Sequence, residues 1–217
     1  KYGGDMSRDT QLFIDLNAIR ANCLLAKNTA PGTKTMAVVK ANAYGHGLAE
    51  VVQTLSPHAD AFAVATIDEA LTLREMTNLD IVIMQGVYRL EQLVEASHRQ
   101  LTVMVHHPDQ VALIKDNPLH QPIKLWLKFD SGMHRLGMTA DQLHHALTEI
   151  KEISWIASNP VLCSHFANAG EPEHPENHPK SEHIFTSVHT LVVQANIQDA
   201  GTGKRSDRSL NNFVIIK

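Results

Sequence analysis

Short apolar runs alternate with longer amphipathic stretches along most of the chain, and this alternation restricts the possible folds more than any other feature. Each apolar run is rich in Val, Ile, Leu or Phe and is too short for a helix, so the runs predict β-strands. Six strands are expected, over residues 36–39, 61–65, 81–84, 101–105, 123–129 and 160–165. Helices are expected over residues 17–27, 46–55, 67–76, 89–97, 108–115, 140–150 and 181–195.

The predicted strands are apolar throughout instead of alternating between apolar and polar residues. This pattern is typical of strands covered by protein on both faces, and a βαβα order then indicates a parallel sheet with right-handed crossovers. No G-x-G-x-x-G fingerprint follows any of these strands, which disfavours an open dinucleotide-binding sheet. We therefore predict an α/β fold, namely a (β/α)₈ TIM-type barrel.

The barrel is expected to be incomplete, with about six βα units. Residues 199–208 are polar and contain glycines, which indicates a loop or tail, and the only later apolar run is 213–216. We expect leader residues over 1–10, a partial barrel over 11–198 and an atypical tail over 199–217. Because the first and sixth strands would then have exposed edges, we expect either a homo-oligomer paired across them or a tail folded over the gap.

Charge and composition disfavour several kinds of partner. A formal net charge of -4 and a pI near 6.4 provide no basic surface for nucleic acid or for an anionic membrane. The apolar runs are too short to span a bilayer, and the first residues lack the apolar stretch of a signal peptide. Cys23 and Cys163 lie far apart and suggest no disulfide framework. We expect a cytoplasmic protein.

Lys40 follows three apolar residues at the end of the first predicted strand, in the run Lys-Ala-Asn-Ala-Tyr-Gly-His-Gly. The site of such a barrel forms at the carboxyl ends of its strands, so the amine is expected at the mouth. Apolar surroundings disfavour the ammonium, as a lysine that condenses with an aldehyde requires. Tyr44 lies in the following turn, and the first backbone N–H groups of the next helix could face a phosphate. A strand-end lysine with a merely structural turn is the alternative.

Two further segments place reactive side chains at strand ends. In the run Lys-Phe-Asp-Ser-Gly-Met-His-Arg-Leu-Gly, Arg135 offers a bidentate donor fork for a phenolate or carboxylate. Lys128 lies inside the fifth strand, where a free ammonium is costly, and an ion-pair network of Lys128, Asp130 and Arg135 is the alternative interpretation. The sixth strand ends in Ser-His-Phe-Ala, where His165 could stack on a flat heteroaromatic ring, although a lone histidine is more often a satisfied core residue.

These three segments, in this order, resemble the signatures of the alanine racemase family. Residues 40–47 look like its cofactor-lysine signature without a departure, residues 128–137 are similar to its second signature, and residues 164–167 to its third. The resemblance extends over residues 11–183. It implies the N-terminal barrel of a fold type III pyridoxal-phosphate enzyme, an isomerase that interconverts L-alanine and D-alanine for peptidoglycan precursor supply.

The resemblance also implies a role for each matching residue. Lys40 would hold pyridoxal 5'-phosphate covalently and act as one of two proton-transfer bases, and Tyr44 would help to hold the phosphate. Arg135 would bond the phenolic oxygen of the cofactor and lie beside the substrate carboxylate. His165 would pack near the cofactor ring. Lys128 is the supporting residue, and its counterpart is carbamylated in many members, which turns a buried cation into an anion that orients the arginine.

The chain also departs from the family pattern. The second base of the family is a tyrosine from a C-terminal domain of the partner subunit, and no segment here resembles that domain. We therefore expect a truncated racemase, weak or inactive by itself, that forms a homo-oligomer through its barrel edges or the family dimer face. The sequence does not separate alanine from serine as substrate. The candidates for the pocket edge are Asp68, Glu69, Met84 and Tyr88.

Two other functions fit parts of the sequence. A single-domain pyridoxal-phosphate-binding protein without turnover matches the chain length, but its lysine has a different local context. A metal-binding protein is suggested by the 14 histidines, which are densest over residues 173–183. Two prolines prevent a regular helix there, so His174 and His178 need not share a face, and no set of four ligands is apparent. We expect no metal site.

Overall fold

The strands of this protein form a closed ring. The computed structural model describes residues 12–165, 167, 191–194 and 213–216, and within them each strand pairs with its neighbours in the order β1 to β8. The strands are β1 Lys34–Val38, β2 Ala61–Val64, β3 Asp80–Ile83, β4 Thr102–Val105, β5 Lys124–Lys128, β6 Val161–His165, β7 Leu191–Gln194 and β8 Phe213–Ile216.

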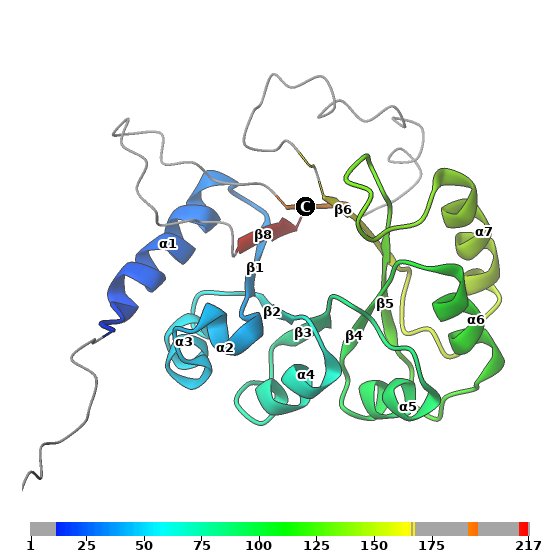
Figure 1. The fold of residues 1–217 in the computed structure, drawn as a ribbon, viewed down its shortest axis with the longest axis horizontal. Coiled ribbons are helices and arrows are strands. Elements are labelled where there is room, and N and C mark those ends of the chain that lie inside the picture. Colours follow the sequence, from blue (N-terminus) through cyan, green and yellow to red (C-terminus); the bar gives the residue numbers. More distant parts are fainter. Residues whose placement is uncertain (1–11, 166, 168–190, 195–212, 217) are drawn as a thin grey trace, which may run out of the picture.

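Helices lie outside the ring; α1 precedes β1, and the others connect consecutive strands (Figure 1). Those of the described segments are α1 Leu16–Thr29, α2 Lys40–Tyr44, α3 Leu48–Leu55, α4 Ile67–Arg74, α5 Leu90–His98, α6 Pro108–Asp116 and α7 Ala140–Lys151. Local sequence explains where several begin: Asp15 caps α1, and Thr66 and Thr139 open capping boxes on α4 and α7. Pro108 occupies the first turn of α6, where its missing N–H has no helical partner to lose.

The six expected strands are all present and parallel, so the prediction of an α/β barrel with about six βα units is confirmed. Their register brings Met36 beside Ala61 and Trp126 beside Val161. Because the strands are parallel, all their carboxyl ends open on one side of the ring, where the connecting segments to the helices begin.

The ring closes in a way that the sequence analysis left open. β7 pairs parallel with β6, and β8 pairs antiparallel with both β7 and β1 (Figure 1). Of the two outcomes expected for the edges of the first and sixth strands, the tail folded over the gap is therefore confirmed, and residues 213–216 of that tail belong to the barrel. Residues 1–10 lie outside the described residues.

The helix predicted over 181–195 is wrong in the part that the structure describes. Residues 191–194, the end of the helix expected over 181–195, form the strand β7, and residues 181–190 lie outside the described residues. The two consecutive valines, Val192 and Val193, are β-branched and favour an extended backbone. Pairing with Cys163 and Ser164 of β6 provides the partner for that backbone.

Two apolar layers hold the barrel together. The layer inside the ring consists of alternate strand residues, which are Met36, Val38, Ala61, Ala63, Val82, Met104, Trp126 and Cys163. The layer between strands and helices is larger and includes Phe62, Ile81 and Ile83, each fully buried. Strands β2 and β4 are buried at every position, as expected for a sheet covered on both faces.

Within the described segments, no helix combines the length and the apolar character needed to cross a membrane.

Candidate functional site

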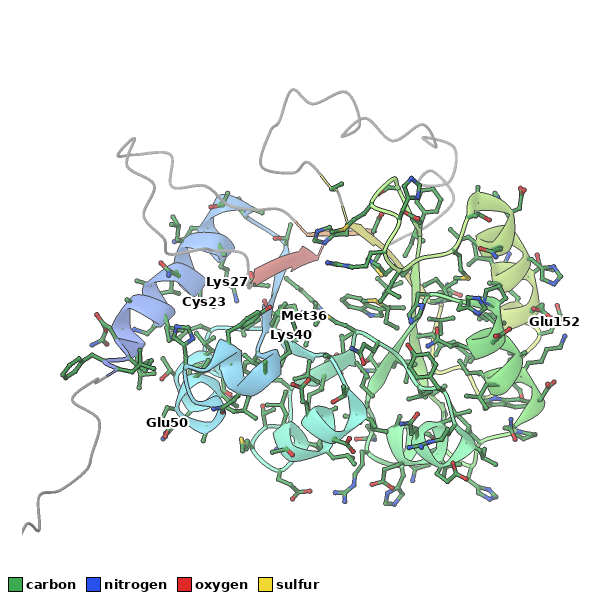
Figure 2. The ribbon with its side chains drawn as sticks, viewed as in Figure 1. Cys23, Lys27, Met36, Lys40, Glu50 and Glu152 are labelled. Atoms are coloured by element: carbon green, nitrogen blue, oxygen red, sulfur yellow. The ribbon has the colours of Figure 1, made fainter. Side chains whose placement is uncertain are left out.

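Lys40 lies just beyond the carboxyl end of β1, which ends at Val38. The preceding Val38 and Val39 are buried, whereas Lys40 is only partly buried. Figure 2 shows Lys40 near Met36 toward the middle of the ring of strands. The strand therefore delivers the amine to the mouth of the barrel, which is where the sequence analysis expected it.

The chain after Lys40 makes an unusual turn. The residues from Ala41 to Tyr44 have φ angles of 52 to 55°, so α2 is a left-handed turn, and Gly45 follows with φ 82°. The Nζ atom of Lys40 lies 5.9 Å from the centroid of the Tyr44 ring. The next helix begins at Leu48, and the N–H of Leu48 donates to Oδ1 of Asn42 at 2.8 Å, so this N–H already has an acceptor.

A cavity of about 260 Å³ opens beside Lys40 at the carboxyl ends of the strands. Its lining residues are Met36, Lys40, Ala65, Met84, Gln85, Met104, Trp126, Lys128, Arg135, Leu136, Cys163, Ser164 and His165. Four of them, Met36, Met104, Trp126 and Cys163, also fill the barrel interior and so provide an apolar floor. The cavity lies near the lower end of the roughly 300–1,000 Å³ of small-molecule sites, which suits a compact single-ring ligand.

Lys128 at the end of β5 lines this cavity. Burial lowers the pKa of Lys128, and the nearby Arg135 lowers it further, against the opposing effects of Cys163 and Asp130. Burial also raises the pKa of the Cys163 thiol to about 12, so Cys163 stays neutral. In the described part of the chain Lys128 has no salt bridge, because Asp130 pairs with His134 at 3.0 Å. The alternative ion-pair network therefore does not form there.

The loop that carries Arg135 is closed at its base. Asp130 N donates to Met138 O at 3.0 Å, and Met138 N donates to Lys128 O at 2.8 Å. Inside the loop, Oδ1 of Asp130 accepts from the N–H groups of Gly132 and His134, both at 3.0 Å. These bonds hold the otherwise exposed Arg135 over the rim of the cavity.

A pair of serine hydroxyls joins the same loop to β6. Ser164 Oγ lies 2.7 Å from Ser131 Oγ and 2.9 Å from Phe129 O, and Ser131 Oγ lies 3.3 Å from His165 O. The two hydroxyl protons serve two of these three contacts at a time. Because His165 follows Ser164, this contact fixes the arginine loop relative to the imidazole. Neither serine was singled out in the sequence analysis, although both lie inside the signature segments.

The structure brings together four of the five expected site residues, Lys40, Lys128, Arg135 and His165. Tyr44 is 40% exposed and is not among the residues that line the cavity. Of the candidates for the pocket edge, Met84 lines the cavity. Asp68 is exposed and is not among the lining residues, Tyr88 bonds His106 at 3.2 Å, and Glu69 bonds backbone N–H groups.

Sequence reasoning missed the lining residues Gln85, Trp126 and Met104. Each lies within or directly after a predicted strand, but a strand residue faces the interior only by alternation in a known register. In the described part of the chain, no group of three His, Cys, Asp or Glu could hold a metal ion. His174 and His178 lie outside the described residues.

The Asp130 carboxylate makes the loop sensitive to acid. Although partial burial favours the neutral acid, the N–H groups of His134 and Gly132 and the His134 imidazole together lower the pKa of Asp130 below 3.8. The stabilisation from its ionised form is thus complete above pH 3.8 and is lost as the pH falls through the lowered pKa. We expect Asp130→Asn to cost about 1 kcal/mol at neutral pH and nothing at strongly acidic pH. Urea unfolding of both chains across this pH range measures the difference in their free energies of unfolding. A difference that does not change with pH would contradict the prediction.

Gly137 closes the loop in a conformation that other residues rarely adopt. Its φ is 141°, and a Cβ there would lie 2.7 Å from Asp130 N and 2.9 Å from Phe129 C, both backbone atoms that cannot move aside cheaply. We expect Gly137→Ala to destabilise the chain by about 1–3 kcal/mol and to displace Arg135. Gly132→Ala is the control for the close contact, since Gly132 also has a positive φ, 122°, but a Cβ there meets nothing within 4 Å. Equal thermal stabilities of the two variants would contradict the role of the close contact.

The fold and the site together define a class of protein. It is a (β/α) barrel that gathers a strand-end lysine, a second buried amine, a guanidinium and an imidazole around one small cavity. The family model of the alanine racemase N-terminal domain matches residues 14–200. The chain therefore belongs to the alanine racemase family.

Individual relatives agree with this assignment. The alanine racemase of Thioalkalivibrio sulfidiphilus is 40% identical over 96% of this chain and 58% of the relative. The biosynthetic alanine racemase of Escherichia coli is 40% identical over 75% of this chain and 45% of its own length. The crystal structure of the biosynthetic alanine racemase from Pseudomonas aeruginosa superposes with a TM-score of 0.78 at 34% identity, over 83% of this chain and 51% of that chain. The chain thus spans about half the length of these relatives.

Proposed function

We propose that this chain is the cofactor-binding barrel of an alanine racemase, in which Lys40 holds pyridoxal 5'-phosphate covalently. The observation that carries the proposal is the meeting of Lys40, Arg135 and His165 around one cavity with an apolar floor. This donor set fits the cofactor, because an amine suits its aldehyde, a guanidinium suits an anionic oxygen, and an imidazole can lie against a flat ring. When bound, this cofactor supplies electron withdrawal from the Cα atom of an attached amino acid.

The residues of the chain would divide the remaining work. Lys40 would remove or return the proton at Cα on one face, and Arg135 would hold the phenolic oxygen of the cofactor and the carboxylate of alanine. His165 would support the ring from β6. Burial raises the pKa of Tyr44, and Glu69 raises it further, so the phenol stays protonated and can donate to a phosphate oxygen.

Racemisation needs a proton-transfer group on each face of the substrate. In this chain we propose one such group, Lys40. Because the chain covers 58% of one relative and 45% of another, we propose complete turnover, a homo-oligomer and peptidoglycan precursor supply only for a racemase of the full length of these relatives. For the 217-residue chain by itself we propose Cα proton exchange with weak or absent racemisation.

Borohydride reduction in the presence of pyridoxal 5'-phosphate, followed by peptide mapping, tests the cofactor site. We expect one phosphopyridoxyl group, on the peptide that contains Lys40. The same group on another lysine would overturn the assignment. Incubation with L-alanine in deuterium oxide then tests the chemistry, with deuterium expected at Cα. Attachment at Lys40 without exchange would instead indicate a pyridoxal-phosphate-binding protein without turnover.

We also propose that Lys128 is carbamylated. Burial lowers the pKa of the Lys128 amine and so increases the fraction in the neutral, nucleophilic form. Attack of that form on carbon dioxide forms an N–C bond, breaks one C–O π bond and releases one proton. The resulting anion would lie beside Arg135, which replaces a repulsion between two cations by an attraction. Carbon-13 NMR in labelled bicarbonate should show one carbamate signal that Lys128→Met removes. A spectrum without that signal in the wild-type chain would contradict the modification.

A further inference from the structure

The turn after Lys40 requires support from outside itself. Ala41, Asn42, Ala43 and Tyr44 all have left-handed φ angles near 55°, and asparagine is the only one of these residue types that tolerates them readily. Left-handed backbone crowds Cβ against a carbonyl oxygen, so L-residues visit it singly and not in runs. A run of four such residues therefore persists only where the surroundings enforce it.

Glu69 on α4 provides that enforcement. Its Oε1 accepts from the N–H of Ala41 at 2.7 Å, and its Oε2 accepts from the N–H groups of Ala65 at 2.8 Å and Thr66 at 3.2 Å. Lys40 and Ala65 both line the cavity, one after β1 and the other after β2. One partly buried carboxylate thus joins the two neighbouring segments of the cavity wall.

Capping of α4 explains only part of this arrangement. Glu69 belongs to the capping box of that helix, which accounts for its bond to Thr66 and for the return bond from Glu69 N to Thr66 Oγ1. The bond to Ala41 crosses to a different element, 28 residues earlier in the chain. It satisfies the N–H that directly follows Lys40, at the start of a turn where such donors have no acceptor within the turn.

We propose that Glu69 is a positioning residue that holds the left-handed turn and thereby aims the Lys40 amine into the cavity. This inference rests on the proposed attachment of pyridoxal 5'-phosphate to Lys40. Glu69 itself is not among the residues that line the cavity. It would therefore act by bonding the backbone N–H of Ala41 and not by contact with a ligand.

Glu69→Gln separates the two duties of the side chain. The amide has nearly the same shape but one acceptor oxygen, which can serve the helix cap or Ala41, while its NH₂ group faces the remaining donor. Attachment at Lys40 is measured by borohydride trapping at increasing pyridoxal-phosphate concentrations. We expect the concentration that gives half-maximal attachment to rise about tenfold, which is the effect of losing one charge-assisted hydrogen bond. Asp68→Asn is the matched control, since it removes the same charge from an exposed neighbour in the same helical turn.

A second substitution distinguishes positioning from simple helix capping. Glycine adopts left-handed backbone without steric cost, so Ala41→Gly should make the turn less dependent on Glu69. We expect Ala41→Gly combined with Glu69→Gln to bring attachment to within about threefold of the wild type. Failure of this rescue, or an equal loss in Asp68→Asn, would overturn the proposal.

Amide hydrogen exchange of residues 40–44, measured without cofactor, keeps the proposal separate from the proposed function. Glu69→Gln should accelerate exchange in this segment about tenfold, and Asp68→Asn should leave it unchanged. If the wild-type chain attaches no cofactor at Lys40, the proposed function fails, and exchange alone decides whether Glu69 holds the turn. Unchanged exchange in Glu69→Gln would overturn the role of Glu69 in either case.

Discussion

Replacement of Lys40 by alanine should abolish covalent attachment of pyridoxal 5'-phosphate and lower Cα deuterium exchange of L-alanine by about 10²–10⁴-fold, the usual contribution of a positioned base. The expectation follows from the position of Lys40 just after β1, where it lines the same cavity as Arg135 and His165. Two lysines line this cavity, and the other is Lys128, the last residue of β5. Mass spectrometry after borohydride reduction and NMR of alanine measure the two effects.

The control for this substitution is Lys34→Ala. Lys34 lies on the same strand but at its amino end, where it is exposed and remote from the cavity. It should retain attachment and exchange. Lys40→Ala should also unfold at nearly the wild-type urea concentration, since its contact with the Tyr44 ring is worth about 1 kcal/mol or less. Retained attachment in Lys40→Ala would refute the site.

Replacement of Phe62 by alanine should destabilise the chain by about 3–5 kcal/mol. Phe62 on β2 has no exposed surface and belongs to the layer between the strands and the outer helices. Truncation leaves a cavity that rigid strands on either side cannot fill, and the loss is a large part of the about 5–15 kcal/mol that stabilises a typical domain. Urea unfolding followed by circular dichroism measures the change.

Phe13→Ala is the matched control, because Phe13 is 86% exposed and should change the free energy of unfolding by about 0.5 kcal/mol or less. A third variant, Phe62→Leu, keeps most of the apolar volume and should fall between the two. Similar losses in Phe13→Ala and Phe62→Ala would mean that β2 is not enclosed by the helices as the structure shows.

The central strands were predictable because they are apolar at nearly every position. The strand expected over 81–84 corresponds to β3 Asp80–Ile83, and that over 101–105 to β4 Thr102–Val105. β7 was not predictable in the same way, since the apolar run 191–193 is too short to distinguish a strand from a helix. Its pairing with β6, and that of β8 with β1, are long-range contacts that no local pattern encodes.

The site shows the same division. The signature segments, through their resemblance to the family, suggested Lys40, Tyr44, Lys128, Arg135 and His165, and four of these line one cavity. The sequence did not reveal that Ser131 and Ser164 would join two of these segments, or that Glu69 would bond the residue after Lys40. Those partners lie 28 to 33 residues apart and meet only when parallel strands align their ends.

The amino-acid sequence by itself determined the six parallel strands, the helices between them and the family, and it suggested the reactive residues, because burial patterns and local signatures are properties of short segments. Only the tertiary structure decided that the ring closes through an antiparallel last strand, that Tyr44 lies outside the cavity as described, and that a carboxylate on α4 supports the turn after Lys40. The physical reason is that backbone hydrogen bonds and side-chain packing between distant segments depend on register and distance, which exist only in the folded barrel.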